Sequence, residues 1–250
     1  MELDAYLAII ASEAARMIAV AEEAGLDAAT PTCPTWNIRN LLLHTGEVHR
    51  WATTVVAGEF TSLAKVPNDT LGTLPTDAKT LEWFRSGVEK LVDTLANADQ
   101  SVKYDAFLAD PPTPRLLFWA RRQAMEISIH RVDAESSVGR CTPFPPKVAA
   151  DGIDEFVTGF ITRGKGAVHR DTPHTIGVAP ADVPERWTVT ISDGPLVTER
   201  KAGSADCKVT GTASDIFMAL WNRPGLDESE VKGDVSLFTD LGANVRIRWG

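Results

Sequence analysis

Three residues of types that bind metal ions stand at positions where helices could bring them together. Glu126 and His130 are four residues apart, so in a helix their side chains share one face, one turn apart. The positions that flank this arc, such as Phe118 and Ile127, are mostly apolar, which predicts that both side chains are buried. A buried carboxylate needs a cation, a proton or hydrogen bonds, because an uncompensated charge is costly away from water.

His44 is the third candidate ligand, because it interrupts an apolar stripe in a predicted helix that contains Leu41 and Val48. Nitrogen and oxygen ligands suit zinc, and also iron, nickel or manganese, and three protein ligands leave positions open for water or substrate. The alternative is an ordinary polar pair of Glu126 and His130, with His44 as a core histidine whose hydrogen bonds are satisfied. Asp133 is interpreted either as a hydrogen-bond partner that orients a ligand histidine or as part of a surface ion pair.

The remaining histidines and two tryptophans receive plainer interpretations. His49 is expected to be an ordinary helix residue, and His169 and His174 are expected in loops. Trp36 and Trp51 are expected in the core of a helical bundle rather than at a substrate-binding surface.

The elements that would position these residues follow from periodicity and from turn signals. Apolar spacings of three and four predict helices over 3–24, 36–56, 77–96, 115–137 and 147–162, with Thr35 capping the second. Alternation over 187–191, the turn signal Asp193-Gly194 and the extended pattern over 196–201 predict a β-hairpin. The fold class is therefore α+β: a helical bundle with a four-helix core over 1–163, followed by a small α+β domain over 170–250.

Composition excludes several functional classes. The chain has 250 residues, and its apolar share of 44% allows cores of normal size. A net charge of −9 argues against nucleic acids and anionic membranes as partners, since both require a basic surface. Three widely spaced cysteines favour reduced thiols, and the acidic start is unlike a signal peptide. No run of 18 or more apolar residues is present, so no membrane-spanning helix is expected. Reduced thiols indicate a cytoplasmic protein, and a monomer is expected because no apolar stripe is left over.

The order and spacing of several motifs resemble those of a known family. Segment 32–51 carries Pro34, Trp36, Arg39, Leu41 and His44 in the order of the family signature "P-x-W-x-hydrophobic-R-x-L-x-x-H". Further matches are 126–135, 149–156, 209–215, 220–223 and 233–234. Over nearly its whole length the chain resembles the mycothiol-dependent maleylpyruvate isomerases, which belong to the DinB-like superfamily of metalloenzymes and carry a small sterol-carrier-like C-terminal domain.

That resemblance implies a ligand set and a chemistry. It carries the metal ligands over as His44, Glu126 and His130, with zinc favoured, and it implies mycothiol, a low-molecular-weight thiol of actinobacteria, as cosubstrate. The implied activity is that of an isomerase or an S-transferase, in which a metal-bound thiolate adds to a small electrophile. The resemblance also places Arg223 at the position of a catalytic arginine that could grip a substrate carboxylate. The alternative for Arg223 is a solvated cation at a helix C-terminus.

Two other functions are compatible with the same residues and domains. A bundle joined to a sterol-carrier-like domain could be a non-catalytic protein that binds a small apolar ligand. The same three ligands could also serve a metal-dependent hydrolase, but no further buried carboxylate stands out as its general base.

Overall fold

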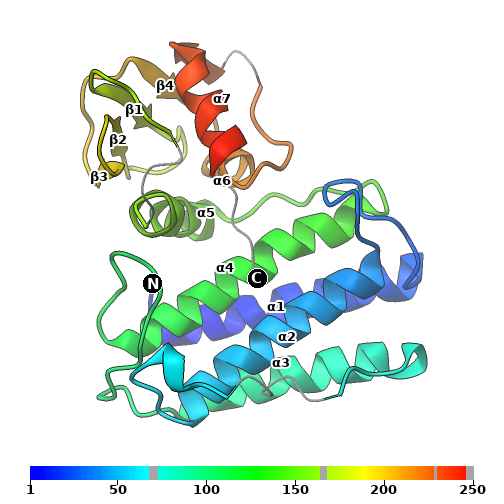
Figure 1. Cartoon of the computed structure of the whole chain (residues 1–250). Coiled ribbons are helices and arrows are strands. Elements are labelled where there is room, and N and C mark those ends of the chain that lie inside the picture. Colours follow the sequence, from blue (N-terminus) through cyan, green and yellow to red (C-terminus); the bar gives the residue numbers. More distant parts are fainter. Residues whose placement is uncertain (68–72, 164–167, 228–229, 246–250) are drawn as a thin grey trace. The chain divides into compact units, whose positions relative to one another are not determined.

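The computed structural model describes residues 1–67, 73–163, 168–227 and 230–245, and the chain forms two compact units (Figure 1). The first unit comprises Met1–Phe107 and Pro111–Thr142. The second comprises Leu108–Asp110 and the chain from Pro143 onward. Helices build the first unit, and a mixed sheet with helices builds the second, so the expected α+β class is confirmed. None of the helices in the described part of the chain is long and apolar enough to span a membrane.

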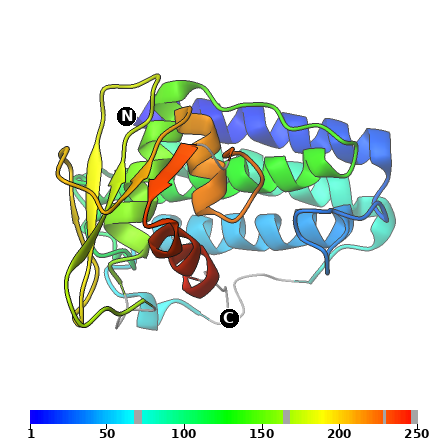
Figure 2. The ribbon, with the colours of Figure 1, turned by 90° about the horizontal axis from the view of Figure 1, so that it is seen from above.

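The first unit is a bundle of four long helices, as predicted. They are α1 (Leu3–Ala24), α2 (Ile38–Ala57), α3 (Thr80–Asn97) and α4 (Arg115–Ser136), with short 3-10 helices at Leu63–Lys65 and Asp77–Lys79. Helix α4 packs against α1 and α2, and α3 packs against α1 and α2 (Figures 1 and 2). Gly25 ends α1 at a positive φ of 83°, a conformation that glycine adopts without strain.

The start of α2 differs from the prediction that Thr35 caps this helix. Asn37 is the N-cap, because its side chain accepts a hydrogen bond from the Asn40 amide while the Asn40 side chain accepts one from the Asn37 amide. Upstream, the chain turns at Cys33, and a bridge between Ala29 and Asn37 holds the turn closed. Thr35 lies inside this turn, so the helix cannot begin there.

Helix α4 is the buried centre of the first unit, since almost every residue from Leu116 to Glu135 is inaccessible to solvent. Several of these buried residues are charged, and ion pairs compensate them. The guanidinium of Arg131, for example, donates to Glu13 at 2.6 Å and to Glu135 at 2.9 Å. A buried ion pair that is fully hydrogen-bonded costs little net energy, but breaking one leaves an uncompensated charge. Arg131 on helix α4 is therefore buried as part of a connected set of charges with Glu13 and Glu135.

The second unit is a mixed sheet with helices. Its described helices are α5 (Pro146–Asp154), which continues as a π-helical segment Glu155–Phe160, then α6 (Ala213–Leu220) and α7 (Val235–Asn244). Its described strands, β1 (His174–Val178), β2 (Trp187–Ile191), β3 (Val197–Glu199), β4 (Cys207–Val209) and β5 (Val231–Gly233), are ordered β3-β2-β1-β4-β5. The predicted hairpin is present as β2 and β3, with Val189 opposite Thr198. Strand β1 pairs antiparallel to β2 and parallel to β4.

Three features of the second unit differ from the sequence interpretation. Helix α5 was placed in the first domain, but it packs on α6, where Gly152 approaches the ring of Phe217 so closely that any side chain would collide with it. The rings of Phe156 and Phe160 also contact Trp221, so the boundary between units lies near 142 rather than 163. His174, expected in a loop, begins β1, and α7 was not anticipated.

Candidate metal centre

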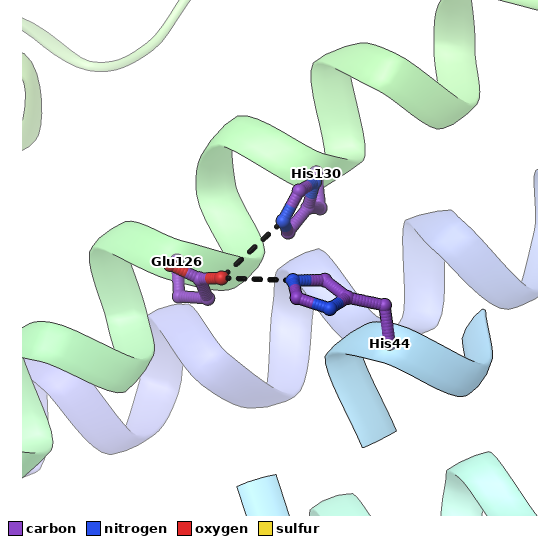
Figure 3. Close-up of side chains that lie close together, drawn as sticks. All are labelled: His44, Glu126 and His130. Carbon is purple, nitrogen blue, oxygen red and sulfur yellow. Dashed lines mark ion pairs between the residues drawn. The ribbon is translucent and has the colours of Figure 1, made fainter. Parts of the chain in front are cut away.

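The three predicted ligands converge between α2 and α4 (Figure 3). The Nε2 atoms of His44 and His130 lie 3.5 and 3.3 Å from the same oxygen, Oε1 of Glu126. One ligand atom from each residue falls within 4.8 Å of the others. Among the described residues, no other group of three such side chains comes this close together. Two imidazole nitrogens and one carboxylate oxygen at these separations can bind a single divalent ion with open positions.

Arg122 determines which oxygen of Glu126 is available. This guanidinium is fully buried one turn before Glu126 on α4, and it donates to Oε2 at 3.0 Å. Oε1 is therefore the oxygen that faces the imidazoles. Burial alone would raise the pKa of Glu126, but hydrogen bonds from His130 and His44 and the charge of Arg122 hold it well below its usual range. Glu126 is thus ionised and ready to bind a cation.

His130 is oriented by a second carboxylate. Its Nδ1 donates to Oδ2 of Asp133 at 2.9 Å, and Thr32 donates to the other oxygen of Asp133 at 2.6 Å. Asp133 is fully buried, so the interpretation as part of a surface ion pair is wrong, and its contact with His130 is the one expected of a side chain that orients a ligand histidine. Burial lowers the pKa of His130, but hydrogen bonds to Asp133 and Glu126 outweigh it and raise the pKa to about 9. With Nδ1 occupied, Nε2 is the atom directed at Glu126.

His49 has an environment that the sequence interpretation missed. It is fully buried on α2, its ring stacks near Phe84, and its Nδ1 lies 2.6 Å from the amide oxygen of Gln123. Because an amide oxygen only accepts hydrogen bonds, Nδ1 carries the proton. Burial lowers the pKa of His49 to about 4, so this imidazole is neutral at physiological pH. The position of Gln123 could have indicated a polar partner for a buried histidine, because Gln123 stands one turn before Glu126 on the same helix face.

Trp36 lies beside the centre rather than in the bundle core. Its ring centroid is 4.8 Å from that of His44 and 6.0 Å from that of His130, and its side chain is half-buried. Trp51 instead packs against Trp119 and Phe107 in an aromatic cluster of the first unit. The prediction of a core position therefore suits Trp51 better than Trp36.

Arg223 lies in the second unit, just after α6. Its guanidinium donates to the carbonyl oxygen of Trp221 at 2.6 Å, and the side chain is half-buried. Its catalytic role stays a prediction.

Comparison with family models matches both units. Residues 7–135 match the model described as the mycothiol maleylpyruvate isomerase N-terminal domain, and residues 147–242 match the C-terminal domain model of the same family. The chain belongs to the mycothiol maleylpyruvate isomerase family. Comparisons with curated proteins and with solved structures each found no match.

Membership of the mycothiol maleylpyruvate isomerase family fits the geometry of the centre. The N-terminal match spans His44, Glu126 and His130, and the C-terminal match spans Arg223. The two matches divide the chain between 135 and 147, close to the boundary between the compact units. The resemblance seen in the sequence is therefore confirmed at the level of the family.

Proposed function

We propose that this chain is a metal-dependent enzyme that uses mycothiol to act on a small electrophilic substrate, as an isomerase or an S-transferase. The observation that carries the proposal is the convergence of His44, Glu126 and His130 on one point. Membership of the family supplies the thiol as the expected cosubstrate. A cytoplasmic location and a monomeric state belong to the same proposal.

The charges around the centre support an anionic ligand. When an ion is bound, the two imidazoles that hold it contribute no charge, and the negative charges of Glu126 and Asp133 are partly offset by the buried guanidinium of Arg122. A divalent ion, zinc in the first instance, would lower the pKa of a thiol and hold it as the reactive thiolate. The surrounding side chains then leave a net positive charge in a site of low dielectric, which favours one thiolate over a neutral thiol.

The side chains divide the work between holding the centre and handling the substrate. Glu126 and the two histidines would hold the ion, Asp133 fixes the ring of His130, and Arg122 keeps one oxygen of Glu126 occupied. Addition of the thiolate to a cis double bond would permit rotation, and elimination would then return the thiol with a trans product. In an S-transferase the carbon–sulfur bond would persist. Arg223 is proposed to grip a substrate carboxylate through a bidentate pair.

The test begins with the metal content of the untagged protein. We expect roughly one equivalent of zinc or another divalent ion in the wild type. His44→Ala should lose the ion, whereas the matched control His174→Ala, which changes a histidine on β1 of the second unit, should keep it. Mycothiol-dependent conversion of maleylpyruvate and of other small electrophiles is then measured. Full activity in a His44→Ala/His130→Ala double variant would contradict the proposal.

One observation favours the alternative of a non-catalytic ligand-binding protein. A hollow of about 310 Å³ lies between α6 and α7 and is lined by apolar side chains that include Leu220, Phe238 and Leu241. If neither wild type nor His44→Ala contains metal, even after incubation with zinc, this hollow becomes the first candidate for a functional site.

A further inference from the structure

Helices α2 and α3 lie side by side in the first unit (Figure 1). A hollow of about 320 Å³ lies between them and is lined by Arg50, Thr53, Thr54, Ser86, Gly87 and Lys90. In the described part of the chain, this lining carries two cations, three hydroxyl groups and no carboxylate. The chain as a whole has a net charge of −9, so the hollow is opposite in charge to the protein around it.

Local packing fixes the guanidinium of Arg50. Its central carbon lies 3.6 Å from the ring centroid of Trp83, and it donates to the carbonyl oxygens of Trp83 at 2.7 Å and of Gly46 at 3.1 Å. Any side chain at Gly46 would collide with the ring of Trp83. Any side chain at Gly87 would collide with Nη1 of Arg50. The two glycines therefore let α2 and α3 close around this cation, which is held in place before any ligand binds and so loses little entropy on binding.

Arg50 has no carboxylate partner among the residues that the structure describes. Arg131, by contrast, is paired with both Glu13 and Glu135. The carbonyl oxygens of Gly46 and Trp83 engage two of the five N–H groups of Arg50, which leaves three for an incoming acceptor. Burial lowers the pKa of Arg50, because partial removal from water disfavours its charge. An anion in the hollow would compensate this charge.

We propose that the hollow between α2 and α3 binds a small phosphomonoester, with the phosphate group on Arg50 and Lys90. The planar fork of a guanidinium matches two oxygens of a phosphate, and a lysine supplies a second positive charge. Nζ of Lys90 lies 3.9 Å from Asp93, but both side chains are exposed, and such a pair is weak enough to yield to a dianion. None of the lining residues is a metal ligand, so this inference goes beyond the proposed function.

The size and the hydroxyl groups of the hollow favour an ester over a free phosphate ion. A volume of about 320 Å³ is in the range of sites for small organic molecules. The hydroxyl of Thr53 donates to the His49 carbonyl, and that of Ser86 donates to the Trp83 carbonyl. Each hydroxyl oxygen can then accept a hydrogen bond from a hydroxyl group on the organic part of the ligand.

Titration of the isotope-labelled full chain with glycerol phosphate, followed by nuclear magnetic resonance, tests the site. We expect the amide signals of residues that line the hollow to shift, with weaker binding of inorganic phosphate and none of glycerol. Arg50→Gln should weaken binding about tenfold, the effect of losing a hydrogen bond between charged groups. Lys90→Gln should weaken it about threefold, because this cation is exposed. The matched control Arg85→Gln removes a cation of α3 that does not line the hollow and should change the affinity by less than about twofold.

A phosphate group could also bind a divalent ion at the metal centre, so the titration is repeated with His44→Ala. Binding in the hollow should be unchanged in this variant, and its loss would overturn the inference. The inference is also overturned if glycerol phosphate shifts none of these signals, if inorganic phosphate binds as tightly as the ester, or if a folded Arg50→Gln or Lys90→Gln variant keeps the wild-type affinity. If Arg50→Gln does not fold, Lys90→Gln alone decides.

Discussion

Metal binding should depend steeply on pH, because a proton competes with the ion for His130. The pKa of this imidazole is raised to about 9 by Asp133 and Glu126, so Nε2 is protonated at neutral pH until an ion displaces the proton. Because pH 7 lies about two units below the pKa of His130, removing its proton lowers metal affinity about 100-fold, or by ~2.7 kcal/mol, relative to alkaline solution. Affinity should rise about tenfold per pH unit up to pH 9.

Isothermal titration of cobalt(II) into the untagged protein measures this effect between pH 7 and 9. Titrations in two buffers with different ionisation enthalpies give the number of protons released, to which His130 should contribute about one at pH 7. Asp133→Asn removes a carboxylate that raises the pKa of His130, so its metal affinity should vary less with pH. An affinity that does not change between pH 7 and 9, with no proton released, would refute the reasoning.

Three further predictions concern the stability of the two units. The pKa of buried His49 lies below that of the unfolded chain, so stability should be full above pH 6.5 and fall by about 3 kcal/mol as pH approaches 4. Urea unfolding across this range tests it, and an unchanged loss in His49→Gln would assign the effect to other groups. Asn37→Ala removes the capping box of α2 and should cost about 1 kcal/mol, seen as a melting temperature lower by a few degrees; an unchanged melting temperature would show that the cap is dispensable. Gly152→Val drives a Cβ into the ring of Phe217 and should destabilise the second unit by about 1–3 kcal/mol while metal content stays at wild-type level. If calorimetry gave this variant the same unfolding temperature as wild type, the result would contradict the close packing of α5 on α6.

Features that depend on local spacing could be predicted from the sequence. Glu126 and His130 share a face because they belong to one helix, and that relation holds whatever packs against it. The bounds of α1 were predicted correctly because its apolar stripe is regular and Gly25 ends it. His44 was found because a titratable ring inside an apolar stripe is conspicuous.

Features that depend on long-range contacts could not be predicted. Thr35 and Asn37 are both of residue types that cap helices, and the pairing of Ala29 with Asn37 across the turn favours Asn37 as the cap. His49 lies outside the single stripe assigned to α2, but this helix packs against both α3 and α4 and so buries a wider arc. Strand β1 lacks clear alternation, and its identity depends on pairing with β2 and β4, which follow it in the chain.

The assignment of His44, Glu126 and His130 to two helices of the first unit has an evolutionary consequence. A duplicated gene could accumulate changes throughout the sheet of the second unit, or exchange that unit by recombination, without altering any of the three ligands. Purifying selection on the metal centre would act on α2, α4 and the turn that holds Trp36. Divergence in the rest of the chain would then proceed at its own rate, and lineages of such proteins could diversify around an inherited centre.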